Sequence, residues 1–323
     1  AQIEIARRAN YFILPDTGLV SIESDLQIFL DVPKLAVGDV NGDARTDIVS
    51  STRHEIRVFL RQQDGGFARQ PSRTYPLRLV TPKDHISGSG GVTAEAHDID
   101  GDHRLDLLIS HVEGGFGNAT TTINVHMNHD GEWNLDAPDQ TMVSESSLGS
   151  NVLYDIDGDG RQELLRIELQ FGVFEIIELL VTREIDIQAS IHAFEAGTGF
   201  REKPLMRKKL SIPISFDTFR PKGFFPTANI DLNADGFLDF VSSAKGDAIE
   251  VYLGDSRGPF SNHAGRQRLS SAGNIHFGDL NRDRLPDFLI FDPHHFDVPV
   301  QVGRNLGTLE GTPATIDDRP ELP

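Results

Sequence analysis

A nine-residue acidic loop occurs five times in the chain and constrains its fold more than any other feature. In every copy, loop positions 1, 3 and 5 are Asp or Asn and position 9 is Asp or Glu. So many carboxylates repel one another unless a cation lies among them, and oxygen ligands in this number suit calcium better than magnesium or zinc. The copies begin at Asp39, Asp98, Asp155, Asp231 and Asp279.

The flanking residues show that this loop is not an EF-hand. An EF-hand ends with a Glu at position 12 and lies between two helices. Here position 12 is held by non-acidic residues, namely Ser50, Ile109, Arg166, Ser242 and Ile290. Apolar, partly β-branched residues precede and follow each copy, so we predict that the loop joins two strands. A single copy could equally be an acidic turn without metal, but five copies in one register favour a metal site.

The spacing of the loops predicts a repeat fold. Successive loops begin 59, 57, 76 and 48 residues apart. Without irregular insertions the repeating unit is about 45–55 residues long, which is the size of a four-stranded propeller blade. We therefore predict an all-β fold, a β-propeller of six or seven four-stranded antiparallel blades. The acidic loop is predicted to lie between the first two strands of a blade.

The predicted boundaries follow the loops. One propeller spans residues 1–312, and 313–323 form an irregular tail. An incomplete first blade occupies residues 1–32, with its second to fourth strands at 3–6, 11–14 and 27–30. Five complete blades are predicted at 33–91, 92–148, 149–225, 226–272 and 273–312. In the first of these, the strands are expected at 34–39, 47–51, 55–61 and 74–79.

The blade predicted at 149–225 carries the largest insertion, residues 171–184. Eight of its fourteen residues are apolar, and several recur at helical spacing. Either a short amphipathic helix or a long β-hairpin fits this pattern. The apolar residues would either pack on their own blade or form a docking surface for a partner.

Composition restricts the function further. The formal charge of −19 would fall to about −9 with five calcium ions bound, and it argues against a nucleic-acid partner. The chain has no Cys, which excludes disulfides, thiolate nucleophiles and Cys-bound zinc. No apolar run reaches the length of a transmembrane helix. No signal peptide is recognised at the start, so we expect a mature or trimmed piece of a longer protein.

Catalytic motifs are not found. The sequence has no nucleophile elbow, no His-Glu-x-x-His and no phosphate loop, so no catalytic or cofactor-binding residue is predicted. His294 and His295, beside Asp292 and Asp297, could hold a transition metal, although a plain surface loop is favoured there. Trp133, the single Trp, could stack on a sugar but is better interpreted as a turn anchor.

The loops resemble those of the FG-GAP and VCBS repeat family, whose best-known members are the integrin α-subunit propellers. The family loop reads D-x-[DN]-x-[DN]-G-x-x-D, and the similarity covers about residues 33–310. The Phe-Gly signature is present at Phe277-Gly278, but the Gly-Ala-Pro part is absent. Position 6 departs from Gly at Ala44, His103 and Arg284, where we expect a strained φ or a different backbone.

The resemblance implies about five structural calcium ions. The ligands would be the side chains at positions 1, 3, 5 and 9 and the backbone carbonyl at position 7. The implied ligands are Asp39, Asn41, Asp43, Arg45, Asp47, Asp98, Asp100, Asp102, Arg104, Asp106, Asp155, Asp157, Asp159, Arg161, Glu163, Asp231, Asn233, Asp235, Phe237, Asp239, Asp279, Asn281, Asp283, Leu285 and Asp287.

The sequence therefore favours a calcium-stabilised recognition, adhesion or scaffold module that binds protein or glycan, and not an enzyme. Weak calcium loops fill only where free calcium is near millimolar, so an extracellular, cell-surface or periplasmic location is expected. Two alternatives stay open. One is a secreted polysaccharide-active enzyme, which would need a convergent acid/base pair in a pocket. The other is a structural part of a larger surface assembly.

Overall fold

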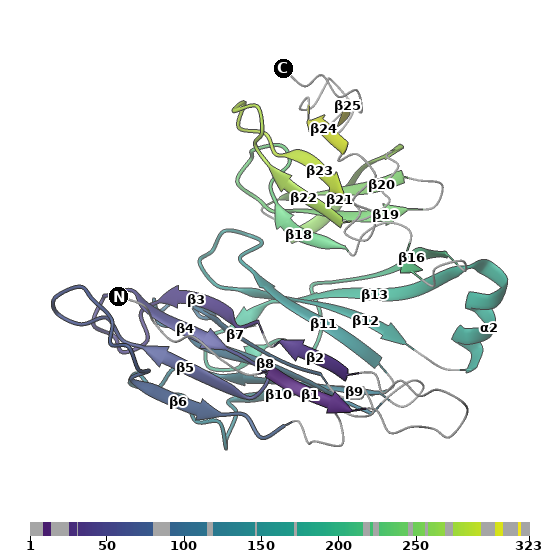
Figure 1. Cartoon of the computed structure of the whole chain (residues 1–323). Helices are drawn as coiled ribbons and strands as arrows, with labels where there is room; N and C mark the ends of the chain where they lie inside the picture. Colours follow the sequence, from purple (N-terminus) through teal and green to yellow (C-terminus); the bar gives the residue numbers. More distant parts are fainter. Residues whose placement is uncertain are drawn as a thin grey trace. The chain divides into compact units, whose positions relative to one another are not determined.

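The structure, a computed structural model, consists almost entirely of antiparallel β-sheets (Figure 1). It describes residues 9–13, 26–30, 32–79, 91–114, 119–145, 147–170, 173–215, 220–221, 226–244, 248–255, 258–268, 274–291, 301–305 and 316–317. The chain divides into two compact units, residues 1–148 and 149–323. This division coincides with a predicted blade boundary. The all-β prediction is confirmed.

The first unit contains two four-stranded antiparallel sheets and a strand pair. The pair is β1 (Ala9–Ile13) with β2 (Leu26–Leu30). The next sheet has the order β3 (Lys34–Gly38), β4 (Asp47–Ser51), β5 (Glu55–Phe59), β6 (Arg73–Pro76). The third has the order β7 (Gly91–His97), β8 (Asp106–Glu113), β9 (Thr120–His126), β10 (Gln140–Glu145).

These strands match the sequence prediction closely. The first sheet with a loop was expected at 34–39, 47–51, 55–61 and 74–79, and each strand lies within two or three residues of its predicted ends. The predicted third and fourth strands of the incomplete first blade correspond to β1 and β2, which pair as expected. The predicted strand at 3–6 lies outside the described residues.

The described residues of the second unit form one five-stranded sheet, two four-stranded sheets and a two-stranded hairpin. The first has the order β11 (Ser147–Tyr154), β12 (Glu163–Gln170), β13 (Glu184–His192), β16 (Met206–Ser215), β17 (Arg220–Pro221), with the hairpin β14 (Phe194–Glu195) and β15 (Gly199–Phe200) after β13. The next has the order β18 (Thr227–Ile230), β19 (Asp239–Ala244), β20 (Ala248–Asp255), β21 (Gly258–Arg268). The last has the order β22 (Asn274–Gly278), β23 (Asp287–Phe291), β24 (Gln301–Asn305), β25 (Ile316–Asp317).

The last sheet corrects the prediction of an irregular tail at 313–323. Ile316 and Asp317 form β25 and pair with Asn305 and Arg304 of β24. The Pro and acidic residues of this segment favoured irregular structure in the sequence, but a two-residue edge strand needs only a short extended stretch to pair. The sheet therefore has its fourth strand in the region that was assigned to the tail.

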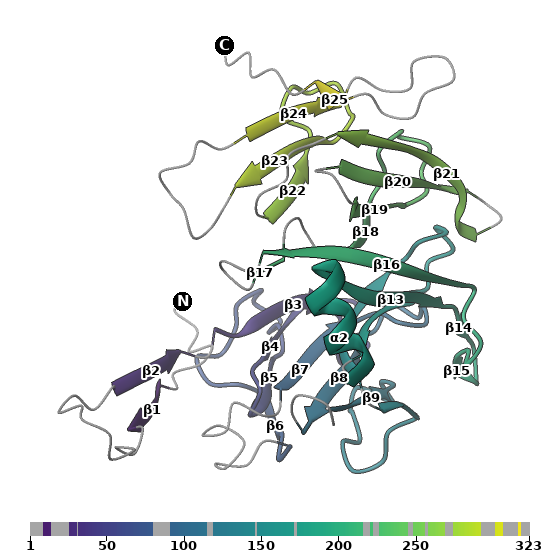
Figure 2. The ribbon, with the colours of Figure 1, turned by 90° about the vertical axis from the view of Figure 1, so that its right-hand side faces the viewer.

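Residues 173–182 of the predicted insertion form a helix rather than a hairpin. Helix α2 (Val173–Thr182) connects β12 to β13 and lies at the ends of these strands (Figures 1 and 2). It ends at Arg183, whose φ of 60° is left-handed and whose N–H donates to the Leu179 carbonyl over 2.9 Å. Within the described part of the chain, no helix has the length and apolar character needed to cross a membrane.

Neighbouring sheets within each unit share hydrophobic cores. In the first unit, Val49 and Val58 of one sheet pack with Ala94 and Ile109 of the next. In the second unit, one core joins the sheet of β11–β17 to that of β18–β21, and another joins the latter to the sheet of β22–β25. Alternate strand residues thus face a neighbouring sheet, as they do when propeller blades stack.

Candidate metal centres

Each acidic loop connects the first two strands of a sheet, as predicted. Loop 1 (39–47) joins β3 to β4 and loop 2 (98–106) joins β7 to β8. Loop 3 (155–163) joins β11 to β12, loop 4 (231–239) joins β18 to β19, and loop 5 (279–287) joins β22 to β23. The five loops therefore occupy the same place in five sheets.

The loop backbone is left-handed at two positions. Position 6 has φ values of 61° at Ala44, 70° at His103 and 73° at Arg284, which confirms the expected strain at these non-Gly residues. Position 4 is also left-handed in all five loops, at Gly42, Gly101, Gly158, Ala234 and Arg282. No constraint was predicted at position 4, although Gly in three of the five copies was a usable signal.

The aspartate at position 1 shapes the loop by accepting backbone hydrogen bonds. Its Oδ2 accepts the N–H of position 6 in all five loops over 2.6–3.1 Å. Position 3 likewise accepts the N–H of position 5 over 2.9–3.3 Å. Position 5 accepts the N–H of position 7 over 2.8–2.9 Å. These bonds curl the backbone around its own acidic side chains.

The acid at position 9 is buried in every loop. One of its oxygens accepts the N–H of position 2 over 2.7–3.0 Å. In four loops, the other oxygen accepts an N–H from the end of the third strand, over 2.7–3.0 Å. The donors are Arg61, Asn128, Gly254 and Asn305. Position 9 therefore also ties the loop to the sheet, a role that the sequence did not reveal.

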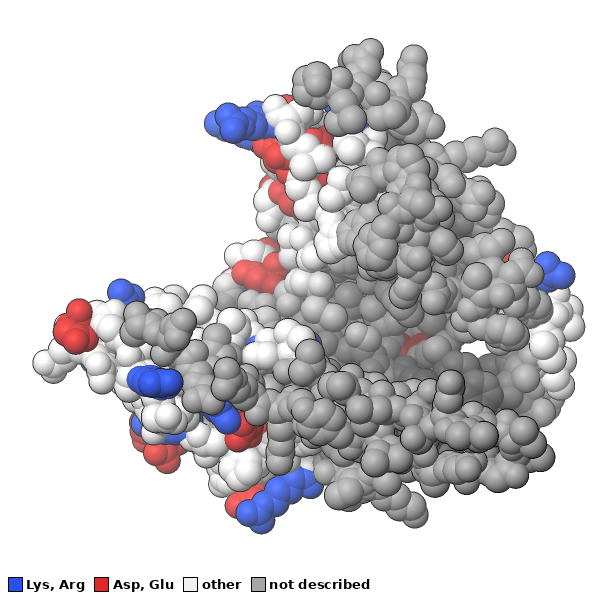
Figure 3. Space-filling model, in the orientation of Figure 1, with Lys and Arg blue, Asp and Glu red and all other residues white. Residues whose placement is uncertain are grey.

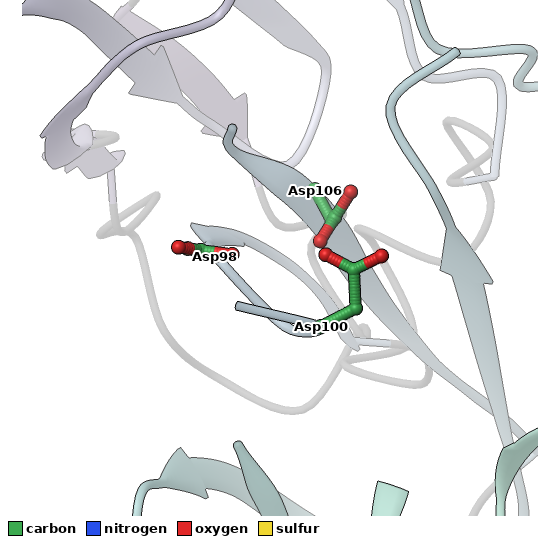
Figure 4. Close-up of side chains that lie close together, drawn as sticks. All are labelled: Asp98, Asp100 and Asp106. Atoms are coloured by element: carbon green, nitrogen blue, oxygen red, sulfur yellow. The ribbon is translucent and has the colours of Figure 1, made fainter. Parts of the chain in front are cut away.

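Two loops bring three carboxylates close together. Oxygens of Asp98, Asp100 and Asp106 lie within 4.8 Å of one another, and Figure 4 shows Asp100 and Asp106 turned toward each other. Oxygens of Asp155, Asp157 and Glu163 form the same group in loop 3. In loops 1, 4 and 5 position 3 is Asn, so the third oxygen there would come from an amide.

Position 5 is arranged differently from the other predicted ligands. In loops 1 to 3 the Arg at position 7 folds back on it, as in the bonds from Arg104 Nε and Nη2 to Asp102 Oδ2 of 2.9 and 2.7 Å. The corresponding guanidinium hydrogen bonds lower the pKa of Asp43 and Asp159. Loops 4 and 5 have Phe237 and Leu285 at position 7. Ligation by the position 7 carbonyls stays a prediction.

Burial raises the pKa of the position 9 acids of loops 1 to 4. It raises the pKa of Asp106, Glu163 and Asp239 to about 7, against the opposing effect of their backbone hydrogen bonds. Burial is also the main cause of the raised pKa of Asp47. An ionised carboxylate in such a place needs a nearby positive charge.

The residues fit a hard cation. The side chains at positions 1, 3, 5 and 9 all offer an oxygen as the metal ligand, and calcium prefers oxygen ligands. In loop 3, Asp155 Oδ1 is buried and has no hydrogen-bond partner among the described residues, even though Asp155 belongs to the three-carboxylate group. A buried carboxylate oxygen without a partner is costly, and a bound cation would remove that cost.

Among the described residues, the other sequence candidates have structural roles. Trp133 is buried, its Nε1 donates to the Leu105 carbonyl over 2.8 Å, and its ring packs against Tyr75. It is therefore the turn anchor that was predicted, and not a sugar platform. His97 is the last residue of β7. His294 and His295 lie outside the described residues.

Comparison with known families agrees with the loops. Two stretches, residues 39–109 and 231–290, match the FG-GAP-like repeat. The first stretch contains loops 1 and 2, and the second contains loops 4 and 5. The chain therefore carries FG-GAP-like repeats, which confirms the resemblance seen in the sequence. No curated protein matches the chain.

Proposed function

We propose that this chain is a calcium-stabilised β-propeller that serves as an extracellular recognition, adhesion or scaffold module for a protein or glycan ligand. FG-GAP repeats are typical of extracellular recognition propellers and are generally protein-interaction modules. The observation that carries the proposal is the recurring acidic loop, with a buried acid at position 9 and, in loops 2 and 3, three carboxylates close together.

In this proposal the ions are structural. Asp and Asn oxygens at positions 1, 3 and 5 and the acid at position 9 would hold calcium in each of the five loops. The ion would offset the repulsion among the carboxylates and fix the connection between the first two strands. Loops of this kind fill at the calcium concentrations found outside the cytosol, which supports an extracellular, cell-surface or periplasmic location.

Uncovered apolar residues support the propeller. Leu35 and Val37 of β3 are 56% and 67% exposed. Ala94 and Ala96 have the same register in β7, and there they are buried against the preceding sheet. Ile275 and Phe277 of β22 also pack toward the sheet before them. We propose that Leu35 and Val37 receive a further blade in a propeller of six or seven blades.

We also propose that the chain is not an enzyme. The loop carboxylates would be occupied by calcium and by backbone N–H groups, so they are poor candidates for an acid/base pair. Binding modules act through exposed surfaces, and helix α2 offers one. Ile177, Leu180 and Val181 are exposed on it, and residues 171–184 therefore stay the proposed docking segment.

Chelation tests the structural role of the ions. Binding to the native state alone stabilises it by about 2.7 kcal/mol per site at a hundredfold excess of calcium over Kd. The melting temperature should therefore fall substantially when EGTA replaces calcium, with magnesium at the same concentration as the control. An unchanged melting curve would mean that the loops are plain turns and would overturn the proposal.

A further inference from the structure

Asn128 touches two acidic loops at once. It lies just after β9 and is only 6% exposed. Its backbone N–H donates to Asp106 Oδ1, at position 9 of loop 2, over 2.7 Å. Its side-chain Nδ2 donates to the carbonyl of Val40, at position 2 of loop 1, over 2.9 Å and to the Leu105 carbonyl over 3.0 Å. One residue thus connects a ligand position of loop 2 to the backbone of loop 1.

Further contacts hold the same two loops together. The Leu105 N–H donates to the Asp39 carbonyl over 2.8 Å, from loop 2 to position 1 of loop 1. The Gly131 N–H donates to Asn128 Oδ1 over 2.8 Å and orients the amide. A Cβ at Gly131 would lie 3.1 Å from the Asn41 Cα, so this turn packs directly against position 3 of loop 1. The backbone of loop 1 cannot shift without disturbing Asn128.

The arrangement recurs in the second unit. The backbone N–H of Asn305 donates to Asp287 Oδ1 in loop 5 over 3.0 Å, and its Nδ2 donates to the Leu232 carbonyl in loop 4 over 2.8 Å. Between loops 3 and 4 the corresponding residue is Gly254, which keeps the backbone bond to Asp239 but has no side chain. Those loops meet through a longer bond, from the Leu238 N–H to the Ile156 carbonyl, of 3.3 Å.

We propose that Asn128 and Asn305 are positioning residues that couple cation binding in loop 1 to loop 2 and in loop 4 to loop 5. The inference rests on the proposed calcium sites. An ion in loop 1 holds Asp39 and Asn41, and with them the Val40 peptide between these two residues. The Val40 carbonyl orients Asn128, whose N–H holds the Asp106 carboxylate. The coupling is reciprocal, because binding at either loop favours the same arrangement.

Trp133 makes the coupling measurable in the full chain. It is the single Trp of the sequence and is hydrogen-bonded to Leu105 beside Asp106. Excitation of Trp133 should therefore sensitise terbium, a calcium substitute, bound in loop 2 and in the adjoining loop 1. The titration phase that Asp102→Asn weakens is the loop 2 phase. Asp43→Asn removes a ligand charge from loop 1. It should shift the terbium midpoint of loop 2 to a concentration about fivefold higher or more. Asp283→Asn in loop 5 is the matched control and should cause no shift.

The test is a double-mutant cycle with Asn128→Ala. In that background, Asp43→Asn should no longer shift the loop 2 midpoint, whereas a merely structural role of Asn128 would leave the shift unchanged. Asn128→Asp keeps the shape and the backbone N–H but removes the amide donor, so it should repeat the result if the Ala variant folds poorly. A shift that persists in both backgrounds, or no shift in the wild type, overturns the coupling. Absence of terbium and calcium binding altogether would instead defeat the proposed function on which the coupling rests.

Discussion

Each acidic loop contains two kinds of carboxylate. The acid at position 9 is buried and accepts backbone N–H groups from its own loop and, in four loops, from the third strand. The acids at positions 1, 3 and 5 are more exposed and hold the loop backbone. The sequence predicted all of them as ligands. It could not show the hydrogen bond that position 9 accepts from the third strand. In loop 2 the donor of this bond, Asn128, lies 22 residues beyond Asp106 in the sequence, and only strand pairing brings the two residues together.

Two conservative substitutions separate these roles. At pH 6, Asp106→Asn should destabilise the protein by about 1–3 kcal/mol with calcium and also in EGTA, because the amide has one acceptor oxygen for the two backbone N–H groups that the carboxyl accepts, so one buried donor loses its partner in both states. Asp100→Asn should reduce stability only with calcium, and in EGTA it should relieve repulsion. Urea unfolding of both variants, with calcium and in EGTA, measures these changes in the free energy of unfolding. Equal behaviour of the two variants would contradict the distinction.

The perturbed acids predict an unusual pH dependence without metal. The folded pKa of Asp106, Glu163 and Asp239 is raised to about 7, whereas unfolded carboxyls have a pKa of about 4. Between these values the native state binds more protons, so its stability falls as pH rises from about 4 through 7. In EGTA the protein should melt at a higher temperature at pH 6 than at pH 8.

Calcium should reverse this trend, because it favours the ionised carboxylates and displaces their protons. Calcium affinity should therefore rise between pH 6 and pH 8. Melting scans at the two pH values, with and without calcium, provide the measurement. A calcium-free protein that is more stable at pH 8 would contradict the burial of protonated acids at position 9.

At the scale of elements, the sequence predicted strands better than it predicted insertions and ends. The four strands predicted between residues 34 and 79 were correct because apolar alternation and turn residues agree in the short segments of β3 to β6. The insertion before β13 left helix and hairpin open, since Phe174, Ile177 and Val181 suit both. The short strand β25 was missed because its pairing with β24 is a tertiary feature that has no local signal.

Helix α2 gives the test at this scale. Ile177 and Leu180 are 54% and 64% exposed, so replacing both with Asp should change the free energy of unfolding by no more than about 0.5 kcal/mol for each substitution. The same double variant should weaken any association made through this segment. Ile187→Asp in β13, which is buried in a shared core, is the control and should abolish folding. Circular dichroism distinguishes the outcomes, and loss of the β signal in the double variant would place the helix face in the core.

For the whole molecule, the negative charge follows from the repeat architecture. The loops hold a large share of the acids behind the net charge of −19. On the face in Figure 3, the coloured acidic and basic side chains lie interspersed.

The boundary predicted between residues 148 and 149 is also the division between the two units, because each repeat has its own strands and loop. Loop spacing alone did not determine the number of blades, since that number depends on how the sheets close.

Counting the bound ions decides between five calcium sites and five plain acidic turns. Crystals grown with calcium, measured for anomalous scattering, should show five ions, one in each loop, with oxygen ligands alone at about 2.3–2.6 Å. Calorimetric titration of the chelator-treated protein should give the same number. Zero or one bound ion would contradict calcium binding by the repeated loops and leave them as acidic turns.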